Sequence, residues 1–174
     1  VGALESTLSA LVVRHESLRT TFVTEGGVAG QRIHPSAEAV LARFDLEALA
    51  PDERERAVRR HAEEEARTPF ELSRGPLLRA TLLRITSSDH VLLFTMHHIV
   101  SDGWSMGVLI QEVGALYSAF SRGEPAPLAP LPIQYADFAV WQRTFLEAGE
   151  LARQLTYWKA QLEGAPPALE LPTD

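Results

Sequence analysis

The sequence contains no cysteine among its 174 residues. This absence excludes disulfide bonds, cysteine-based zinc sites and a thiol nucleophile, and it is typical of a cytoplasmic protein. The sequence also lacks any apolar run approaching the roughly 20 residues that span a bilayer, so no membrane segment is predicted. The segment after Val1 has none of the basic, apolar and small-residue regions of a signal peptide, and we expect Val1 to mark the edge of a fragment.

Positive charge is scarce as well. Lysine and arginine number 16 against 23 aspartate and glutamate residues, for a formal net charge of -7. Nucleic-acid-binding proteins usually carry a basic stripe, so this balance argues against a nucleic-acid partner. The densest basic segment, residues 54–60, places arginines beside glutamates, as on a solvated helix face. The remaining composition, 45% hydrophobic and 22% charged, suits one soluble domain or lobe with its own core.

The apolar pattern predicts helices interleaved with strands. Helices are predicted over residues 3–16, 51–67, 104–120, 135–147 and 151–162. Strands are predicted over residues 20–24, 31–34, 41–46, 77–85 and 91–96. The last strand, VLLFTM, is almost entirely apolar, so we expect it to be buried on both faces at the centre of a sheet. Residues 122–132, with four prolines, and 165–174 are predicted to be coil, and the whole pattern predicts an α/β layered lobe.

A histidine pair stands between the 91–96 strand and the helix that follows it. Strand ends of open α/β sheets are common places for sites, because the chain turns there. Side chains alternate along a strand, so His97 and His98 cannot both face one cavity; one is expected to be catalytic and the other packed or hydrogen-bonded. Gly103 is expected to permit a backbone geometry closed to other residues, and Ser101 or Asp102 to cap the helix.

The residues alone leave three interpretations of this pair open. It is a hydrogen-bonded pair beside a capping aspartate, a metal site, or an acid–base catalyst whose imidazole titrates near pH 7. A metal site is disfavoured, because adjacent strand residues diverge and no second ligand cluster of matching spacing occurs in the sequence.

The motif formed by His97, His98, Asp102 and Gly103 resembles the HHxxxDG signature of chloramphenicol-acetyltransferase-like acyltransferases. The surrounding MHHIVSDGWS is similar to the third core motif of nonribosomal peptide synthetase condensation domains. Three further segments resemble motifs of these domains in the expected order: RHESLRTTF at 14–22, PFEL and GPLLR within 69–79, and YADFAVW at 135–141. The sequence departs from the family pattern at Glu71, where aspartate is usual.

This resemblance implies a chloramphenicol-acetyltransferase-like lobe with a mixed β-sheet flanked by helices. Residues 1–174 are expected to form the N-terminal lobe of a condensation domain. The first family motif would precede Val1, while the fifth to seventh motifs and the C-terminal lobe would follow Asp174. We therefore expect this chain alone to fold at least partly, to be inactive, and to expose an apolar face where the second lobe would pack.

The resemblance also implies a reaction. Condensation domains form an amide between a carrier-bound acyl or peptidyl thioester and the amine of a carrier-bound aminoacyl thioester. Substrates arrive on phosphopantetheine, and no directly bound cofactor or metal is expected. The implied partners are upstream and downstream peptidyl carrier proteins, the missing C-terminal lobe and a neighbouring adenylation domain. His98 is expected to be the catalytic histidine, with Gly103 leaving backbone N–H groups free for the developing oxyanion.

Four other residues are expected to support the site. The resemblance implies that His97 packs beneath the catalytic turn and that Asp102 is structural. Asp102 is expected to form an ion pair with Arg14, or failing that with Arg19, because the 14–22 segment carries both arginines.

Alternative functions stay open on the sequence. They are an ester-forming acyltransferase of the same superfamily, an epimerization domain sharing the histidine motif, and a non-catalytic module that recruits a carrier protein or tailoring enzyme. Heterocyclization domains replace the first histidine by aspartate, so the intact His97 argues against that class.

Overall fold

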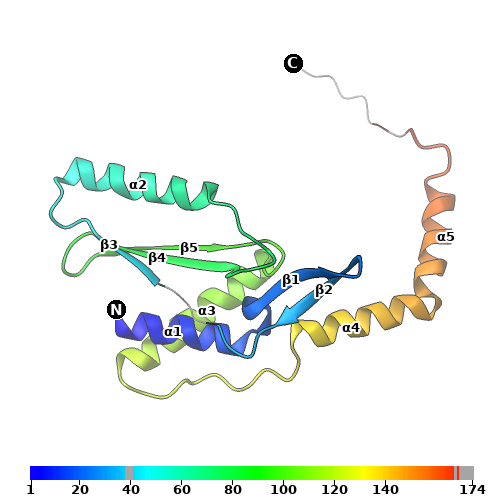
Figure 1. Cartoon of the computed structure of the whole chain (residues 1–174), viewed down its shortest axis with the longest axis horizontal. Helices are drawn as coiled ribbons and strands as arrows, with labels where there is room; N and C mark the ends of the chain where they lie inside the picture. The colour runs from blue at the N-terminus through cyan, green and yellow to red at the C-terminus, as the bar shows by residue number, and fades with distance from the viewer. Residues whose placement is uncertain (38–40, 167, 169–174) are drawn as a thin grey trace. The chain divides into compact units, whose positions relative to one another are not determined.

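The computed structural model describes residues 1–37, 41–166 and 168, and it divides into two compact units, Val1–Gln134 and Tyr135–Asp174 (Figure 1). The helices of the first unit are α1 (Gly2–Arg14), the 3-10 helix η1 (Glu16–Arg19), α2 (Pro51–Arg67) and α3 (Gly103–Ser121). Its strands are β1 (Thr20–Glu25), β2 (Val28–Ile33), β3 (Leu41–Asp45), β4 (Leu78–Arg84) and β5 (His90–Met96). These elements confirm the predicted ones to within a few residues. Most of the predicted terminal coil, residues 167 and 169–174, lies outside the described residues.

The strands form a hairpin and a mixed sheet. Strands β1 and β2 pair antiparallel around Gly26 and Gly27, whose φ angles of 58° and 82° suit the two-residue turn of a hairpin. In the three-stranded sheet, β3 pairs parallel with β4, and β4 pairs antiparallel with β5. A mixed sheet is the arrangement that the sequence predicts.

The predicted place of the 91–96 strand is wrong. Among the described residues β4 is the central strand, and β5 lies at the edge of the sheet. The apolar run of β5 arises because helices cover both of its faces: Phe94 and Met96 pack with the α1 and α3 core, whereas Val91 and Leu93 pack beside α2. A strand covered on both faces can be apolar throughout without lying at the centre of its sheet. Leu92 of β5 is still 37% exposed.

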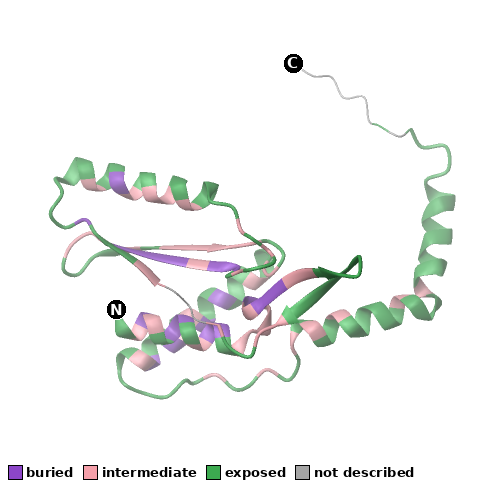
Figure 2. Cartoon of the chain, viewed as in Figure 1, coloured by how far each residue is buried: buried purple, intermediate pink, exposed green. Residues whose placement is uncertain are grey.

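The core lies on both faces of β4, as the alternation of its side chains requires. Leu78 packs with α1 and α3, and Ala80 and Leu82 pack with α1. Leu83 points the other way and packs against Leu46 and Ala57, the latter on α2. Figure 1 shows α1 and α3 on one side of the sheet and α2 on the other, and Figure 2 shows buried positions on β4 and the facing helices.

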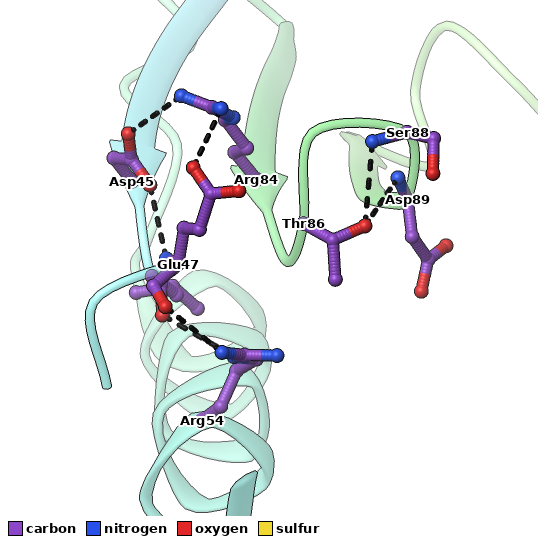
Figure 3. Close-up of polar contacts among 8 residues, drawn as sticks. Asp45, Glu47, Arg54, Arg84, Thr86, Ser88 and Asp89 are labelled. Atoms are coloured by element: carbon purple, nitrogen blue, oxygen red, sulfur yellow. Dashed lines mark hydrogen bonds and ion pairs between the residues drawn. The ribbon is translucent and has the colours of Figure 1, made fainter. Parts of the chain in front are cut away.

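Ion pairs and backbone contacts hold the connection between β3 and α2 at the end of the sheet where β4 ends and β5 begins (Figure 3). Arg84 of β4 contacts Asp45 at 3.0 Å and Glu47 at 2.6 Å. Arg54 of α2 donates to the carbonyl oxygens of Glu47 and Leu49 at 2.9 and 3.0 Å. Because one arginine comes from the sheet and the other from the helix, the connecting loop is fixed to both.

The second unit is helical and highly exposed. It contains α4 (Tyr135–Phe145), the π-helical turn η2 (Leu146–Glu150) and α5 (Leu151–Gln161), which confirms the two predicted helices. Aromatic rings line α4 at helical spacing, and those of Trp141 and Phe145 are stacked with centroids 5.6 Å apart. No residue of α4 or α5 is buried, so an apolar face is exposed. Within the described residues, every helix is too short or too polar to cross a membrane.

Candidate active site

The histidine pair begins a turn directly after β5. The N–H of His97 donates to Leu77 O at 3.0 Å, which ties the turn to the residue before β4. The N–H of Val100 donates to His97 O at 3.1 Å and closes the turn. His98 and Ile99 occupy the tip, where both residues are exposed. The structure thus leaves His98 accessible to a substrate.

His97 is packed and hydrogen-bonded, as expected for one member of the pair. Its ring lies nearly perpendicular to that of Phe70, at 88°, with centroids 5.7 Å apart. Its Nδ1 accepts a hydrogen bond from the N–H of Ile99 at 3.0 Å. A neutral imidazole carries one proton, so acceptance at Nδ1 places that proton on Nε2.

Asp102 caps α3, which confirms one of the two capping candidates. Its Oδ1 accepts hydrogen bonds from the Ser105 N–H at 2.8 Å and the Ser105 hydroxyl at 2.6 Å. The hydroxyl bond and then the N–H bond lower the pKa of Asp102 below its usual value, with a further contribution from nearby His98. A carboxylate at a helix N-terminus is also favoured by the helix dipole.

The predicted ion pair of Asp102 with Arg14 or Arg19 is wrong. Arg14 Nε lies 2.9 Å from Glu112 Oε1, and its guanidinium also donates to the carbonyl oxygen of Ala129. Arg19 pairs with Glu16 at 3.1 Å. The physical reason is that Ser105 engages the Asp102 carboxylate locally, while Glu112 in the middle of α3 is the acid that meets Arg14.

Glu112 is the partner of Arg14 that the sequence interpretation missed. It is 8% exposed and bridges two neighbours, with Oε2 lying 2.6 Å from His15 Nε2. Burial alone would raise the pKa of Glu112, but hydrogen bonds and charges from His15 and Arg14 hold it below its usual value. A signal was present: Glu112 is a lone acid in an apolar helical stretch, and such a buried charge requires a partner.

Gly103 begins α3 without unusual backbone geometry. Its φ is not positive, and a Cβ added to it would meet nothing within 4 Å. The expectation of a conformation closed to other residues is therefore wrong. The extended Asp102, with φ -140° and ψ -174°, makes the turn instead. As the first residue of the helix, Gly103 still has an N–H with no acceptor in its own helix.

A cleft of about 180 Å³ lies beside the turn, between η1 and the start of α3. Its lining is mainly apolar and includes Leu18, Trp104 and Val108 together with the single titratable side chain of His15. Met96 and Val100 also line it. The cleft therefore adjoins the two ends of the turn, whereas the exposed His98 at its tip is not among the lining residues.

The described part of the chain assembles no group of three histidine, aspartate or glutamate side chains placed to hold a metal ion. His97 packs against Phe70, His98 is exposed, and Ser105 engages Asp102. The chemistry that the turn itself offers is hydrogen bonding and proton transfer by an exposed imidazole next to a helix N-terminus.

Comparison with known proteins relates this arrangement to a family. The family model of the condensation domain matches residues 1–174. A linear gramicidin synthase protein from Brevibacillus parabrevis is 52% identical over 174 residues, which are 100% of this chain and 3% of that protein. The X-domain from teicoplanin biosynthesis, solved with OxyB, is 31% identical with a TM-score of 0.87, covering 99% of this chain and 37% of that one.

The epimerization domain from the third module of tyrocidine synthetase B is also similar. It is 26% identical with a TM-score of 0.83, covering 99% of this chain and 39% of that one. These likenesses confirm the predicted chloramphenicol-acetyltransferase-like α/β fold, although the chain spans well under half of each relative. Because the family model matches its whole length, the chain belongs to the condensation domain family found in nonribosomal peptide synthetases.

Proposed function

We propose that this chain contributes the catalytic histidine of an amide-forming condensation domain. The amine of a carrier-bound aminoacyl thioester would attack the carbonyl of a carrier-bound acyl or peptidyl thioester, releasing a thiol. The observation that carries this proposal is the exposed imidazole of His98 at the tip of a turn anchored at both sides. Family membership and the intact histidine motif support it.

The role proposed for His98 is to orient the amine and to accept its proton late. A free α-amino group titrates near 7.7–8.0, so about a tenth is already neutral at pH 7. Removing the proton before attack therefore saves only about 1–1.4 kcal/mol. A base is needed more after attack, when the nitrogen becomes acidic. The free N–H of Gly103 is the proposed donor to the developing oxyanion.

The remaining parts of the machinery lie outside this chain. We propose that both substrates arrive on phosphopantetheine of upstream and downstream peptidyl carrier proteins, and that a neighbouring adenylation domain supplies the acceptor. The chain spans 37% and 39% of two solved relatives, which supports a second lobe contributed by further sequence. Without that lobe the site lacks the closure that orients two reactants, an effect worth about 7–11 kcal/mol.

Two alternatives have a specific observation in their favour. The likeness to an epimerization domain favours proton transfer at a carrier-bound amino acid by the same histidine. The likeness to the X-domain solved with OxyB favours a module that recruits another enzyme. Retention of both His97 and His98 argues against the recruitment module, because a domain without chemistry has no need of them. An ester-forming acyltransferase differs only in its acceptor, and a hydroxyl acceptor in the assay would reveal it.

The test is a product assay with pre-loaded carrier proteins and a complete condensation domain that contains this sequence. His98→Ala is expected to reduce amide formation by about 10²- to 10⁴-fold, the usual contribution of acid–base catalysis. His90→Ala is the matched control, because His90 is an exposed histidine at the other end of β5. His97→Ala should mainly lower the yield of folded protein. Equal amide formation by His98→Ala and the wild type contradicts the assignment.

A further inference from the structure

We propose that Phe70 and Arg79 are positioning residues that hold the imidazole of His97, and through it the turn that presents His98. This inference rests on the proposed function, because it concerns the same catalytic turn. Neither residue touches the tip of the turn, and neither belongs to the histidine motif. Their role follows from an unbroken series of contacts that runs from the end of α2 to the turn.

The series begins with a firmly held arginine. Arg79 Nε lies 2.5 Å from Glu65 Oε1, and Nη2 donates to the carbonyl oxygens of Glu65 and Thr68 at 3.1 and 2.8 Å. Nη1 donates to the carbonyl oxygen of Pro69 at 3.3 Å. These carbonyls belong to the last turn of α2 and the residues just after it, where a cation is favoured by the helix dipole. The planar guanidinium is therefore fixed in orientation as well as in position.

Phe70 connects this guanidinium to the histidine. The Arg79 Cζ atom lies 3.8 Å from the centroid of the Phe70 ring, which is the geometry of a cation–π contact. The Phe70 and His97 rings meet in a perpendicular arrangement with centroids 5.7 Å apart. Phe70 thus touches the fixed cation and the motif histidine at once, and it limits the rotation of both.

His97 then determines the geometry of the turn. Its Nδ1 accepts from Ile99 N–H at 3.0 Å, and its carbonyl oxygen accepts from Val100 N–H at 3.1 Å. The Ser101 hydroxyl donates to the same carbonyl at 3.4 Å. The three residues that follow His98 are thus all hydrogen-bonded to His97. If the His97 ring rotates or protonates at Nδ1, the bond from Ile99 is lost, and the tip carrying His98 is then held only through the backbone carbonyl of His97.

The contact series predicts effects on turnover without an effect on substrate binding. An aromatic pair contributes an energy equivalent to about 2- to 12-fold in a rate or equilibrium constant, so Phe70→Leu should lower kcat about 2- to 10-fold with KM unchanged. Phe70→Tyr keeps the ring and should restore kcat. Arg79→Lys loses the planar fork and should resemble Phe70→Leu. The matched control is Arg84→Lys, because Arg84 ends the same strand and forms ion pairs of its own far from the turn.

Two measurements on the complete condensation domain test the proposal. The first is kcat and KM for amide formation between two pre-loaded carrier proteins. The second is the ¹⁵N–¹H NMR spectrum of the His97 imidazole, which reports whether the proton is on Nε2. In wild-type protein, Phe70→Tyr and Arg84→Lys we expect the Nε2–H form. In Phe70→Leu and Arg79→Lys we expect a mixture of tautomers or exchange broadening, together with the reduced kcat.

The possible results separate this proposal from the proposed function. Unchanged NMR signals and kcat in Phe70→Leu and Arg79→Lys would overturn it, and so would altered signals with unchanged kcat. If Arg84→Lys lowers kcat as much as Arg79→Lys does, the loss reflects general destabilisation of the protein, and the proposal is overturned as well. Full activity of His98→Ala would instead defeat the proposed function, while the tautomer measurement would still decide whether Phe70 and Arg79 hold His97. If Phe70→Leu does not fold, Arg79→Lys and its control carry the same comparison.

Discussion

Replacing Glu112 by alanine is expected to destabilise the first unit strongly, although Glu112 is not part of the proposed chemistry. Its carboxylate lies 2.9 Å from Arg14 Nε and 2.6 Å from His15 Nε2, and the residue is only 8% exposed. Its removal leaves the Arg14 side chain, itself 17% exposed, without its ion partner between α1 and α3. Removing one partner of a buried pair costs about 3–5 kcal/mol, and the partial exposure of Arg14 favours the lower end.

Two further variants separate charge from shape and from general helix effects. Glu112→Gln keeps the volume and one acceptor but loses the charge, so we expect a loss of about 1.5–3 kcal/mol, as for hydrogen bonds to charged groups. Glu55→Ala is the exposed control, because Glu55 and Arg59 form an i,i+4 pair at 3.2 Å with both side chains more than 70% exposed. Such a pair contributes about 0.3–0.5 kcal/mol.

Urea unfolding followed by circular dichroism measures these differences, first at pH 7 and then at decreasing pH. The folded-state pKa of Glu112 is lowered, so its stabilisation is fully present above its unfolded pKa near 4.5 and is lost as the pH falls toward the folded value. The difference between wild type and Glu112→Gln should therefore shrink below that pH. A loss for Glu112→Ala no larger than that for Glu55→Ala would refute the structural role of the buried pair.

Three more predictions concern the turn and the whole chain. Gly103→Pro should fold, because proline is tolerated at the first helical position and the extended Asp102 suits a following proline. It should lower kcat about 10²- to 10³-fold because it removes the backbone N–H, and Gly103→Ala, which keeps that N–H, is the control. Asp102→Ala should remain folded and soluble with a modestly lower Tm, because it loses a cap and no ion pair; insoluble protein would contradict this. Residues 1–174 alone should show helical circular dichroism, should self-associate on a sizing column through the exposed aromatic rings of α4 and α5, and should form no amide. Turnover near that of the complete domain would contradict the need for a second lobe.

Much of the fold was predictable because local chemistry determines it. The Gly26–Gly27 pair specifies the hairpin turn, and both glycines adopt positive φ. Pro51 begins α2 and Pro69 follows its end, as the backbone restrictions around proline require. His97 is half-buried and His98 exposed, as expected for a pair with different surroundings, but both lie in the turn after β5, so strand alternation is not what separates them.

The position of β5 was not predictable by the same means. Its apolar run shows that both faces are covered, but it does not show how many neighbouring strands β5 has. That number depends on backbone hydrogen bonding along the strand edges, which side-chain composition reports poorly. The burial of β4 and the partial exposure of Leu92 distinguish the central strand from the edge strand, but both become visible only in the assembled sheet.

The error about Asp102 concerns which of two acids on one helix forms the pair between helices. Asp102 precedes the first turn of α3, where free N–H groups lie within its reach, so its carboxylate satisfies the helix end. Glu112 lies on the buried face of the same helix, where a carboxylate is stable only beside cations, and it meets Arg14 and His15 from α1 and the residue after it. The two acids therefore have separate duties. Loss of Asp102 should loosen the start of α3 beside His98, whereas loss of Glu112 should weaken the packing of α3 against α1. Asp102 therefore determines the geometry of the site, and Glu112 contributes to the stability of the lobe that carries the site.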